Sequence, residues 1–171
     1  MDTFGLAVDS LGMDQLLGPQ YIRNDPNYHS YILWNPICKL GTRGCTQSNV
    51  FETLRRYPAP GYHVNTKCKI KNGNAKKVPY LGGVTHLVDY QNMAIANITN
   101  GDHLLHSGKV VRQVSTVNDI IYVYTFGDGT GNFGYLNEVL RNVVWDPIDD
   151  QISRSIRLSD PNDPSVRCGC E

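Results

Sequence analysis

The sequence predicts a single α+β domain in which an N-terminal helix is followed by a mainly antiparallel sheet and then by a C-terminal helix. Two windows, residues 46–56 and 135–144, carry apolar residues at helical spacing. Between them, four segments rich in β-branched residues follow one another at short intervals, which favours antiparallel strands over βαβ units. With 171 residues, 40% of them hydrophobic, the chain has the size and apolar content for one core.

The domain boundaries are predicted from composition. Residues 1–30 are rich in Gly, Asp, Asn and Pro and are expected to form a leader. The folded domain is expected to span residues 31–158. Residues 159–171 are polar and are expected to form a flexible tail.

The first helix is predicted at residues 46–56. A Pro-Ala-Pro-Gly run at residues 58–61 ends it, and Val50, Phe51 and Leu54 form its apolar stripe. The lysine-rich segment that follows, residues 61–77, is expected to be a solvated loop or an edge strand.

Four strands and a second helix complete the predicted domain. The strands are expected at residues 84–90, 93–98, 109–114 and 120–126. The last two are expected to pair as a hairpin across a turn at residues 116–119. The second helix is expected at residues 135–144, and its predicted buried side consists of Leu136, Val139, Leu140, Val143 and Val144.

Charge and hydropathy argue against nucleic-acid binding, a signal peptide and membrane insertion. Sixteen basic and sixteen acidic residues give a formal charge of zero, which argues against a protein held to nucleic acid by phosphate contacts. The first residues show no basic start followed by an apolar run, so no signal peptide is predicted. The apolar stretches are too short to span a bilayer, so no membrane insertion is expected. Export would then depend on a larger parent protein or a dedicated machine.

The strongest single candidate for chemistry is Cys45, in Gly44-Cys45-Thr46 at the start of the first predicted helix. The first amide N–H groups of a helix have no intrahelical partner and carry partial positive charge. A thiolate is stabilised there, and Arg43 would act in the same direction, so the cysteine becomes a better nucleophile at neutral pH. The alternative is that Cys45 is a small apolar residue packed at the helix start. The chain has five cysteines, so a monomer keeps at least one free thiol.

The run Cys45-Thr-x-x-x-Val-Phe resembles the helix opening of papain-like hydrolases, including the NlpC/P60-type and CHAP-type amidases. The resemblance implies a papain-like fold, in which the catalytic histidine lies at the start of a later strand. His103 and His106 directly precede the predicted strand at residues 109–114. The resemblance therefore implies a cysteine hydrolase with Cys45 as nucleophile and His103 or His106 as general base.

His86 is a further candidate because it alternates with apolar neighbours on a predicted strand. It could complete the same site, with Asp89 as an orienting carboxylate. The alternative is a structural histidine that is hydrogen-bonded within the sheet.

The same histidines also fit a second chemistry, that of a metal-independent ribonuclease. A histidine would move the 2′-OH proton, while Lys109 and Arg112 would hold the charge of the phosphate. Nucleic acid is expected as a partner only under this alternative. We predict no metal, because neither zinc-ligand spacing nor a His-Glu-x-x-His motif is present.

The glycine-rich segment at residues 127–134 allows a third chemistry. Gly129-x-Gly131-x-x-Gly134 matches a dinucleotide fingerprint, so an NAD-consuming transferase or hydrolase is an alternative. No βαβ unit is predicted around it, which favours a tight turn instead. We therefore predict no cofactor.

The segment Asp2-Thr3-Phe4-Gly5-Leu6 resembles the Asp-Pro-x-Gly-Leu signature that closes the core of bacterial Rhs/YD-repeat proteins, with Thr3 at the proline position. In those proteins a shell built from repeats is cut after the signature, and a variable C-terminal toxin domain is released. The resemblance covers only the leader, so it implies a biological role without fixing the chemistry.

This resemblance implies a secreted polymorphic toxin, an antibacterial effector of a type VI-like secretion system used in interbacterial competition. The domain would be delivered into target bacteria and would act in their cytoplasm or periplasm. Its implied partners are the Rhs repeat shell of the parent protein and a cognate immunity protein. An immunity or adaptor protein is the non-enzymatic alternative.

Overall fold

The computed structural model describes residues 17–61, 68–78, 80–132 and 134–158, the last range by its backbone alone as far as residue 138. Six antiparallel strands form one sheet in the order β1-β6-β5-β4-β3-β2. The strands are β1 (His29–Lys39), β2 (Ala75–Val78), β3 (Gly82–Asp89), β4 (Ala94–Thr99), β5 (Gly108–Val117) and β6 (Ile120–Gly129). The helices are α2 (Gln47–Leu54) and α3 (Gly134–Leu158). No helix within these ranges is both long and apolar enough to cross a membrane.

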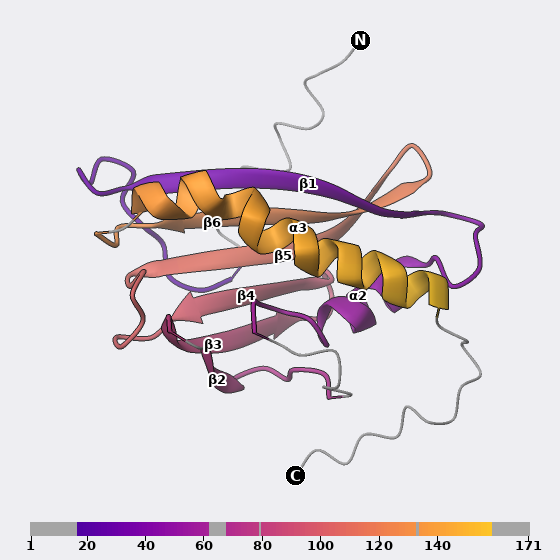
Figure 1. Ribbon diagram of the computed structural model, residues 1–171, viewed down its shortest axis with the longest axis horizontal. Coiled ribbons are helices and arrows are strands. Elements are labelled where there is room, and N and C mark those ends of the chain that lie inside the picture. Colours follow the sequence, from indigo (N-terminus) through magenta and orange to yellow (C-terminus); the bar gives the residue numbers. More distant parts are fainter. Residues whose placement is uncertain (1–16, 62–67, 79, 133, 159–171) are drawn as a thin grey trace.

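The predicted element order is wrong at the N-terminal end, and the papain-like arrangement is wrong with it. The described chain begins its regular structure with a long strand, β1, and the first helix follows that strand (Figure 1). In the described ranges the architecture is a six-stranded antiparallel sheet with α2 inserted after β1 and a long helix, α3, after the last strand.

The sequence pattern does not predict the strand β1, for two reasons. Its inward positions include the polar residues His29 and Asn35, so the apolar alternation is interrupted. It also contains Pro36, which has no N–H to give to a ladder. The proline is tolerated because β1 is an edge strand that pairs only with β6, and the register shifts between Pro36 and Cys38.

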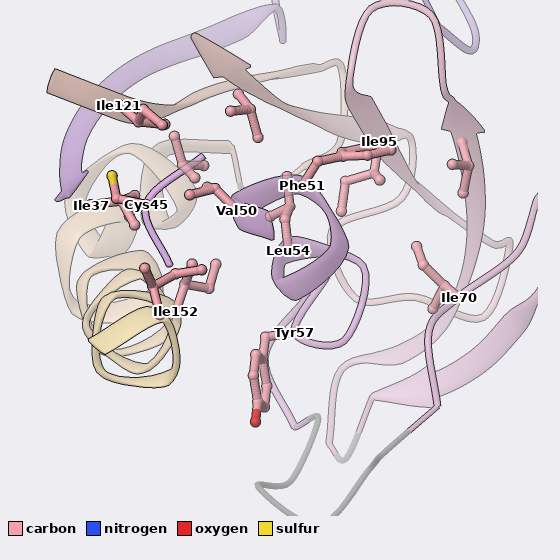
Figure 2. Packing of buried hydrophobic residues seen from close by; sticks show 14 residues of the cluster. Ile37, Cys45, Val50, Phe51, Leu54, Tyr57, Ile70, Ile95, Ile121 and Ile152 are labelled. Atoms are coloured by element: carbon pink, nitrogen blue, oxygen red, sulfur yellow. The ribbon is translucent and has the colours of Figure 1, made fainter. Parts of the chain in front are cut away.

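The main core lies between the sheet and the two helices. Figure 1 shows α3 crossing one face of the sheet, running first along β1 and then past α2. Figure 2 shows the apolar side chains that α2 contributes between these layers. The cluster contains Ile37, Cys45, Val50, Phe51, Leu54, Tyr57, Ile70, Val88, Ile95, Val114, Ile121, Val123, Ile152 and Ile156.

The opposite face of the sheet holds a second, smaller core. Ala96, Val111, Tyr124 and Phe126 are buried there, and Leu17 packs against them. Gly18 lies against Ile98, and the Tyr21 hydroxyl lies 3.2 Å from Ser107 Oγ. The segment before β1 therefore covers part of this face.

The later elements agree better with prediction. The four predicted strands are confirmed as β3 to β6, and the hairpin turn is confirmed by positive φ angles at Asn118 and Asp119. The second helix is longer than predicted, because it continues through Pro147 to Leu158. Its predicted buried side is wrong, since Val139 is 57% exposed and Val143 71% exposed.

Candidate functional site

A cavity of about 90 Å³ lies between the sheet and the first half of α3, and it is partly open to solvent. Its lining comes from β2, β3, β4, β5, α3 and the segments between them. The lining residues are Ala59, Pro60, Val78, Leu81, Val84, Asn97, Thr99, His103, Leu105, Gly108, Lys109, Val110, Val144 and Trp145. Most of these side chains are apolar, and a concave apolar site with a few polar groups is the usual form of a ligand site.

Asn97 lines the cavity and is hydrogen-bonded to His86, which is buried and is not part of the lining. The Asn97 amide nitrogen donates to the Pro58 carbonyl at 2.8 Å, which fixes the orientation of the amide. Its oxygen therefore faces His86, so Nδ1 of His86 donates to it at 2.7 Å. Burial lowers the pKa of His86, with Asn97 opposing the shift and the nearby Lys76 charge adding to it. At neutral pH this imidazole is an uncharged, fully buried structural group.

His103 is the histidine that lines the cavity. The amide of Leu105 donates to its Nδ1 at 3.1 Å, so the neutral ring carries its hydrogen on Nε2. Burial lowers the pKa of His103; Asp102 opposes this shift, and His106 adds to it. The ring is therefore neutral above about pH 6.5, and Nε2–H is its hydrogen-bond donor.

The loop that carries His103 is fixed to the sheet by short contacts. Asp102 accepts a hydrogen bond from the Gly83 amide at 3.0 Å. Gly82 has a φ of +107°, and a Cβ there would lie 2.3 Å from the Asp102 carbonyl oxygen and 2.5 Å from the His103 Cα. Only glycine allows this approach, so the position of His103 depends on Gly82.

The hydroxyl of Thr99, another lining residue, is already occupied. It donates to the Gly108 carbonyl at 2.9 Å and accepts from the Gly108 amide at 2.8 Å. The Asn97 amide is engaged as well, whereas within the described part of the chain no group accepts a hydrogen bond from Nε2 of the lining residue His103.

The two cations predicted to bind substrate, Lys109 and Arg112, do not meet in the cavity. Side chains alternate along β5, and Arg112 faces α3, where it pairs with Asp149. Lys109 is part of the lining, but its side chain extends to the other side of the sheet. Its ammonium lies there 4.0 Å from Asp128, and both side chains are buried. The predicted ribonuclease set of three histidines and two cations is therefore not assembled around one point.

The predicted nucleophile, Cys45, is not a free thiol. Its sulfur is bonded to Cys38 in a disulfide, with 5.9 Å between the Cα atoms, and its side chain is buried. Figure 2 shows Cys45 between Ile37 and Ile152, within the main core. The structure therefore favours the alternative in which Cys45 is a buried packing residue at the start of the helix rather than a nucleophile. Cys68 is also disulfide-bonded.

The structure also keeps the disulfide away from the predicted histidines. Cys38 pairs with Ile121 on β6, which pairs with Thr116 on β5. The loop with His103 ends at Gly108, at the opposite end of β5. About eight residues of strand lie between these ends, or roughly 26 Å. A cysteine–histidine pair is therefore not formed.

The other predicted site residues lie outside the cavity. Asp89 accepts hydrogen bonds from the amides of Gln91 and Asn92, so it stabilises the β3–β4 turn, at the far end of β3 from His103. His106 is exposed, and its Nδ1 lies 3.1 Å from the Thr99 carbonyl oxygen, beside the loop rather than within the cavity.

The glycine-rich segment is explained by close backbone packing. A Cβ on Gly129 would lie 2.5 Å from the Ser107 carbonyl oxygen, and one on Gly131 would lie 2.8 Å from the His106 carbonyl oxygen. These glycines therefore let the β4–β5 loop lie against the end of β6. A dinucleotide phosphate would need free backbone N–H groups at these glycines, but the β4–β5 loop already packs against them.

Sequence reasoning missed most of the cavity lining. Asn97 and Thr99 alternate with apolar residues on β4, and this alternation was the signal that could have found them. Trp145, expected from the sequence to be a core or lid aromatic, is buried against Tyr31 and Leu33, and its Nε1 donates to the Tyr31 hydroxyl at 2.9 Å.

Comparisons with known proteins bear on the fold. No protein-family model matches the chain, and no curated protein matches its sequence. The structure of Ara h 8.0201 matches with a TM-score of 0.50 and 8% identity, over 77% of this chain and 99% of that one. A structure of norcoclaurine synthase from Thalictrum flavum in complex with dopamine and hydroxybenzaldehyde matches with a TM-score of 0.47. The identity is 9%, over 85% of this chain and 96% of that one. A second structure of that enzyme has a TM-score of 0.39 and 12% identity, over 84% and 97%. At such identities a structural likeness describes the fold alone, and the fold of this chain is Bet v1-like.

Proposed function

We propose that this domain binds a small, uncharged, largely apolar molecule with one hydrogen-bond acceptor, in the cavity between the sheet and α3. The observation that carries the proposal is the composition of the lining: mostly apolar side chains together with the imidazole of His103, whose Nε2–H is accepted by no group in the described part of the chain. An acceptor group on the ligand would pair with this donor, while its apolar body would leave water.

The charges around the cavity favour a neutral ligand. Arg112 is paired with Asp149 and Lys109 with Asp128, so neither cation is left to balance an anionic ligand. The lowered pKa of His103 keeps that ring uncharged at neutral pH. A buried ion without a partner is costly, so charged molecules of the same shape should bind more weakly.

The volume of the cavity limits the size of the ligand. An enclosed apolar cavity of about 150 Å³ holds benzene. The cavity here, at about 90 Å³, is smaller, so a single six-membered ring fits only if part of the ligand stays at the open side. Cyclohexanol is therefore a fitting probe, with methylcyclohexane and cyclohexylamine as relatives that lack the acceptor or carry a charge.

The test uses the fluorescence of Trp145, which lines the cavity. The chain has two tryptophans, so Trp34→Phe leaves Trp145 as the only reporter. Cyclohexanol should change its emission with a Kd of about 1 mM or tighter, as the ligand's size allows. Cyclohexylamine should bind more weakly.

The donor is tested by a matched pair of histidine variants. His103→Leu should weaken cyclohexanol binding roughly tenfold and leave methylcyclohexane binding nearly unchanged, because one hydrogen bond is lost. His106→Leu, on the same loop but outside the cavity, should behave like the parent protein. Equal losses for both probes, or no binding of either, would count against the proposal.

We also propose, from a separate observation, that the domain is an effector delivered by an Rhs-type protein. The support is the resemblance at residues 2–6, which lie outside the described part of the chain. The disulfides suit an oxidising compartment such as a bacterial periplasm. A cognate immunity protein and the parent's repeat shell would be its partners.

Expression in bacteria tests this second proposal independently of the ligand. Directing the chain to the periplasm should arrest growth, and co-expression of a genetically linked immunity protein should restore it. Normal growth with folded protein present in the periplasm and, separately, in the cytoplasm would overturn the effector role.

A further inference from the structure

We propose that protonation of His103 displaces its ring from the cavity, so that the site holds its ligand at neutral pH and releases it in acid. This inference rests on the proposed ligand site, because it names how binding there is regulated. Three observations support it: the hydrogen bond by which His103 holds Leu105, the position of both residues in the lining, and the close packing around the Leu105 backbone.

The loop that carries His103 is held by three amide contacts, and one of them differs in kind. The Leu104 amide donates to the Leu81 carbonyl at 2.6 Å, and the His106 amide donates to the His103 carbonyl at 2.9 Å. The Leu105 amide donates instead to the imidazole, at Nδ1 of His103. A carbonyl accepts whatever the pH, whereas Nδ1 accepts only while the ring is neutral. Of these three contacts, acid therefore removes the one to Leu105.

Protonation turns that contact into a conflict. The neutral ring of His103 carries its hydrogen on Nε2, so the added proton goes to Nδ1. Two N–H donors then face each other across 3.1 Å, and neither of them has an acceptor. The charged ring also lies in a lining that is mostly apolar, where an ion without a partner is costly. Either the ring or the Leu105 amide has to move.

The packing around Leu105 decides that the ring moves. A Cβ on Gly131 would lie 2.8 Å from the Leu105 carbonyl oxygen, and one on Gly108 would lie 3.2 Å from it. The backbone at Leu105 therefore has little room, while the imidazole can turn about its side-chain bonds. As the ring of His103 turns away, the ligand loses the Nε2–H donor and one side of the lining.

The charged groups around His103 determine the pH at which this happens. Burial lowers the pKa of His103, Asp102 opposes this shift, and His106 adds to it. The ring therefore stays neutral above about pH 6.5 and becomes protonated below it. Ligand binding should accordingly be constant at neutral pH and should weaken only in acid.

The other elements around the cavity bring charges that are already paired, and one further histidine. Lys77 on β2 lies 4.0 Å from Asp102. The remaining pairs are Lys109 with Asp128, on β5 and β6, and Arg112 with Asp149, on β5 and α3. On β3, burial lowers the pKa of His86, which is hydrogen-bonded to the lining residue Asn97. Because His86 also titrates in acid, the experiment has to separate the two histidines.

The pH dependence of cyclohexanol binding tests the switch, because cyclohexanol itself does not titrate in this range. Trp145 emission in Trp34→Phe gives the Kd between pH 8 and pH 5. The Kd should rise roughly tenfold for each pH unit below the pKa of His103 in the folded protein, since only the neutral ring binds. The ring protons of His103, followed by NMR, should titrate on the same curve. Saturating cyclohexanol should lower that pKa further, because the coupling is reciprocal.

His103→Asn is the matched variant. Its amide oxygen takes the place of Nδ1 and accepts from Leu105 at every pH, and the side chain does not titrate. Cyclohexanol should bind it roughly tenfold more weakly at pH 8, because the donor is lost, but with a Kd that stays constant to pH 5 although His86 is intact. His106→Leu, outside the cavity, should keep the pH profile of the parent protein.

Amide hydrogen exchange tests the loop without a ligand. At pH 5 the Leu105 amide of the parent protein should exchange roughly tenfold or more faster than that of His103→Asn at the same pH. At pH 8 the two proteins should exchange this amide at similar rates.

The outcomes separate the switch from the ligand site. If cyclohexanol binds with a Kd that stays constant to pH 5, or if His103→Asn keeps the pH dependence of the parent, the switch is wrong while the ligand site stands. If cyclohexanol does not bind at pH 8, the proposed function fails, and exchange at Leu105 still decides whether His103 releases the loop. Unfolding of the protein before the His103 ring titrates would also overturn the switch.

Discussion

The guanidinium of Arg112 on β5 pairs with the carboxylate of Asp149 on α3, and both side chains are buried. Arg112 also lies over the ring of Trp145, 4.7 Å from its centroid. The pair therefore joins the part of α3 after Pro147 to the sheet, next to the cavity, and we expect its role to be structural.

Removing one member of this pair should be strongly destabilising. Arg112→Met leaves the Asp149 carboxylate buried without its charge partner, which should cost about 3–5 kcal/mol in the free energy of unfolding. The double variant Arg112→Met/Asp149→Leu should recover much of that loss, because no buried charge remains. Urea denaturation measures all three proteins, and the exposed Arg154→Met serves as control. A folded, stable Arg112→Met would contradict the structural role.

The cysteines should titrate as disulfides. With Cys38 bonded to Cys45, and Cys68 also disulfide-bonded, the oxidised protein should show one reactive thiol of its five, and five after reduction in denaturant. Cys45 should not react with iodoacetamide, whereas a catalytic Cys45 would react first. Replacing both Cys38 and Cys45 by serine should cost about 2–3 kcal/mol of stability, as expected for a short closed loop. Mass spectrometry of alkylated peptides gives the result directly.

The two buried histidines should make the fold sensitive to acid. Burial lowers the pKa of His86 and of His103, so the unfolded chain binds more protons than the folded one below about pH 6.5. Their contribution to stability is fully present above that pH. It is lost as the pH falls from there toward the lower pKa values of the folded state, because the unfolded chain takes up its protons first.

The raised pKa of Asp149, caused by burial and opposed by Arg112 and Asn35, has the opposite sign, so protonation of this carboxyl favours the folded state as the pH falls. Urea denaturation between pH 8 and pH 5.5 should therefore show a declining stability that flattens in His86→Gln/His103→Gln. An unchanged slope in that variant would exclude the histidines as its cause.

Gly82 should be indispensable to the loop that carries His103. Gly82→Ala places a Cβ against the backbone of Asp102 and His103 at a positive φ, so both strain and a clash are introduced. We expect a loss of several kcal/mol or a displaced loop with weakened cyclohexanol binding. Gly41→Ala has a similar positive φ and open space around it, so it should cost only about 1–2 kcal/mol of backbone strain. Equal effects of the two substitutions would show that the close approach is unimportant.

The sequence predicted the elements whose patterns are local. The strands β3 to β6 alternate in the expected way, and the helix α2 begins where Thr46 caps it by accepting from the Asn49 amide at 3.1 Å. Elements that depend on tertiary contacts were missed. β1 tolerates Pro36 because it lies at the sheet edge, and α3 passes through Pro147 because Asp149, Ile152 and Ile156 hold its second half.

The site was predicted less well for the same reason. His103 was identified as a candidate, but the residues expected around it are separated by strand alternation and by strand length. Arg112 and Lys109 are neighbours on β5 yet face opposite sides of the sheet. Cys45 has the position of a nucleophile at a helix start, but its disulfide to Cys38 depends on the turn between β1 and α2.

The central claim is that the cavity beneath the first half of α3 holds a ligand, and the contacts of cyclohexanol with methyl groups test it most directly. In a protein with labelled valine and leucine methyls, intermolecular nuclear Overhauser effects should connect cyclohexanol to Val84, Leu105, Val110 and Val144, which line the cavity. The exposed methyls of Val139 and Val143 should show none. Effects to the lining methyls, lost when Val110→Phe fills the space, are the predicted result. Effects confined to the exposed methyls, or none at any methyl under saturating ligand, would contradict the account.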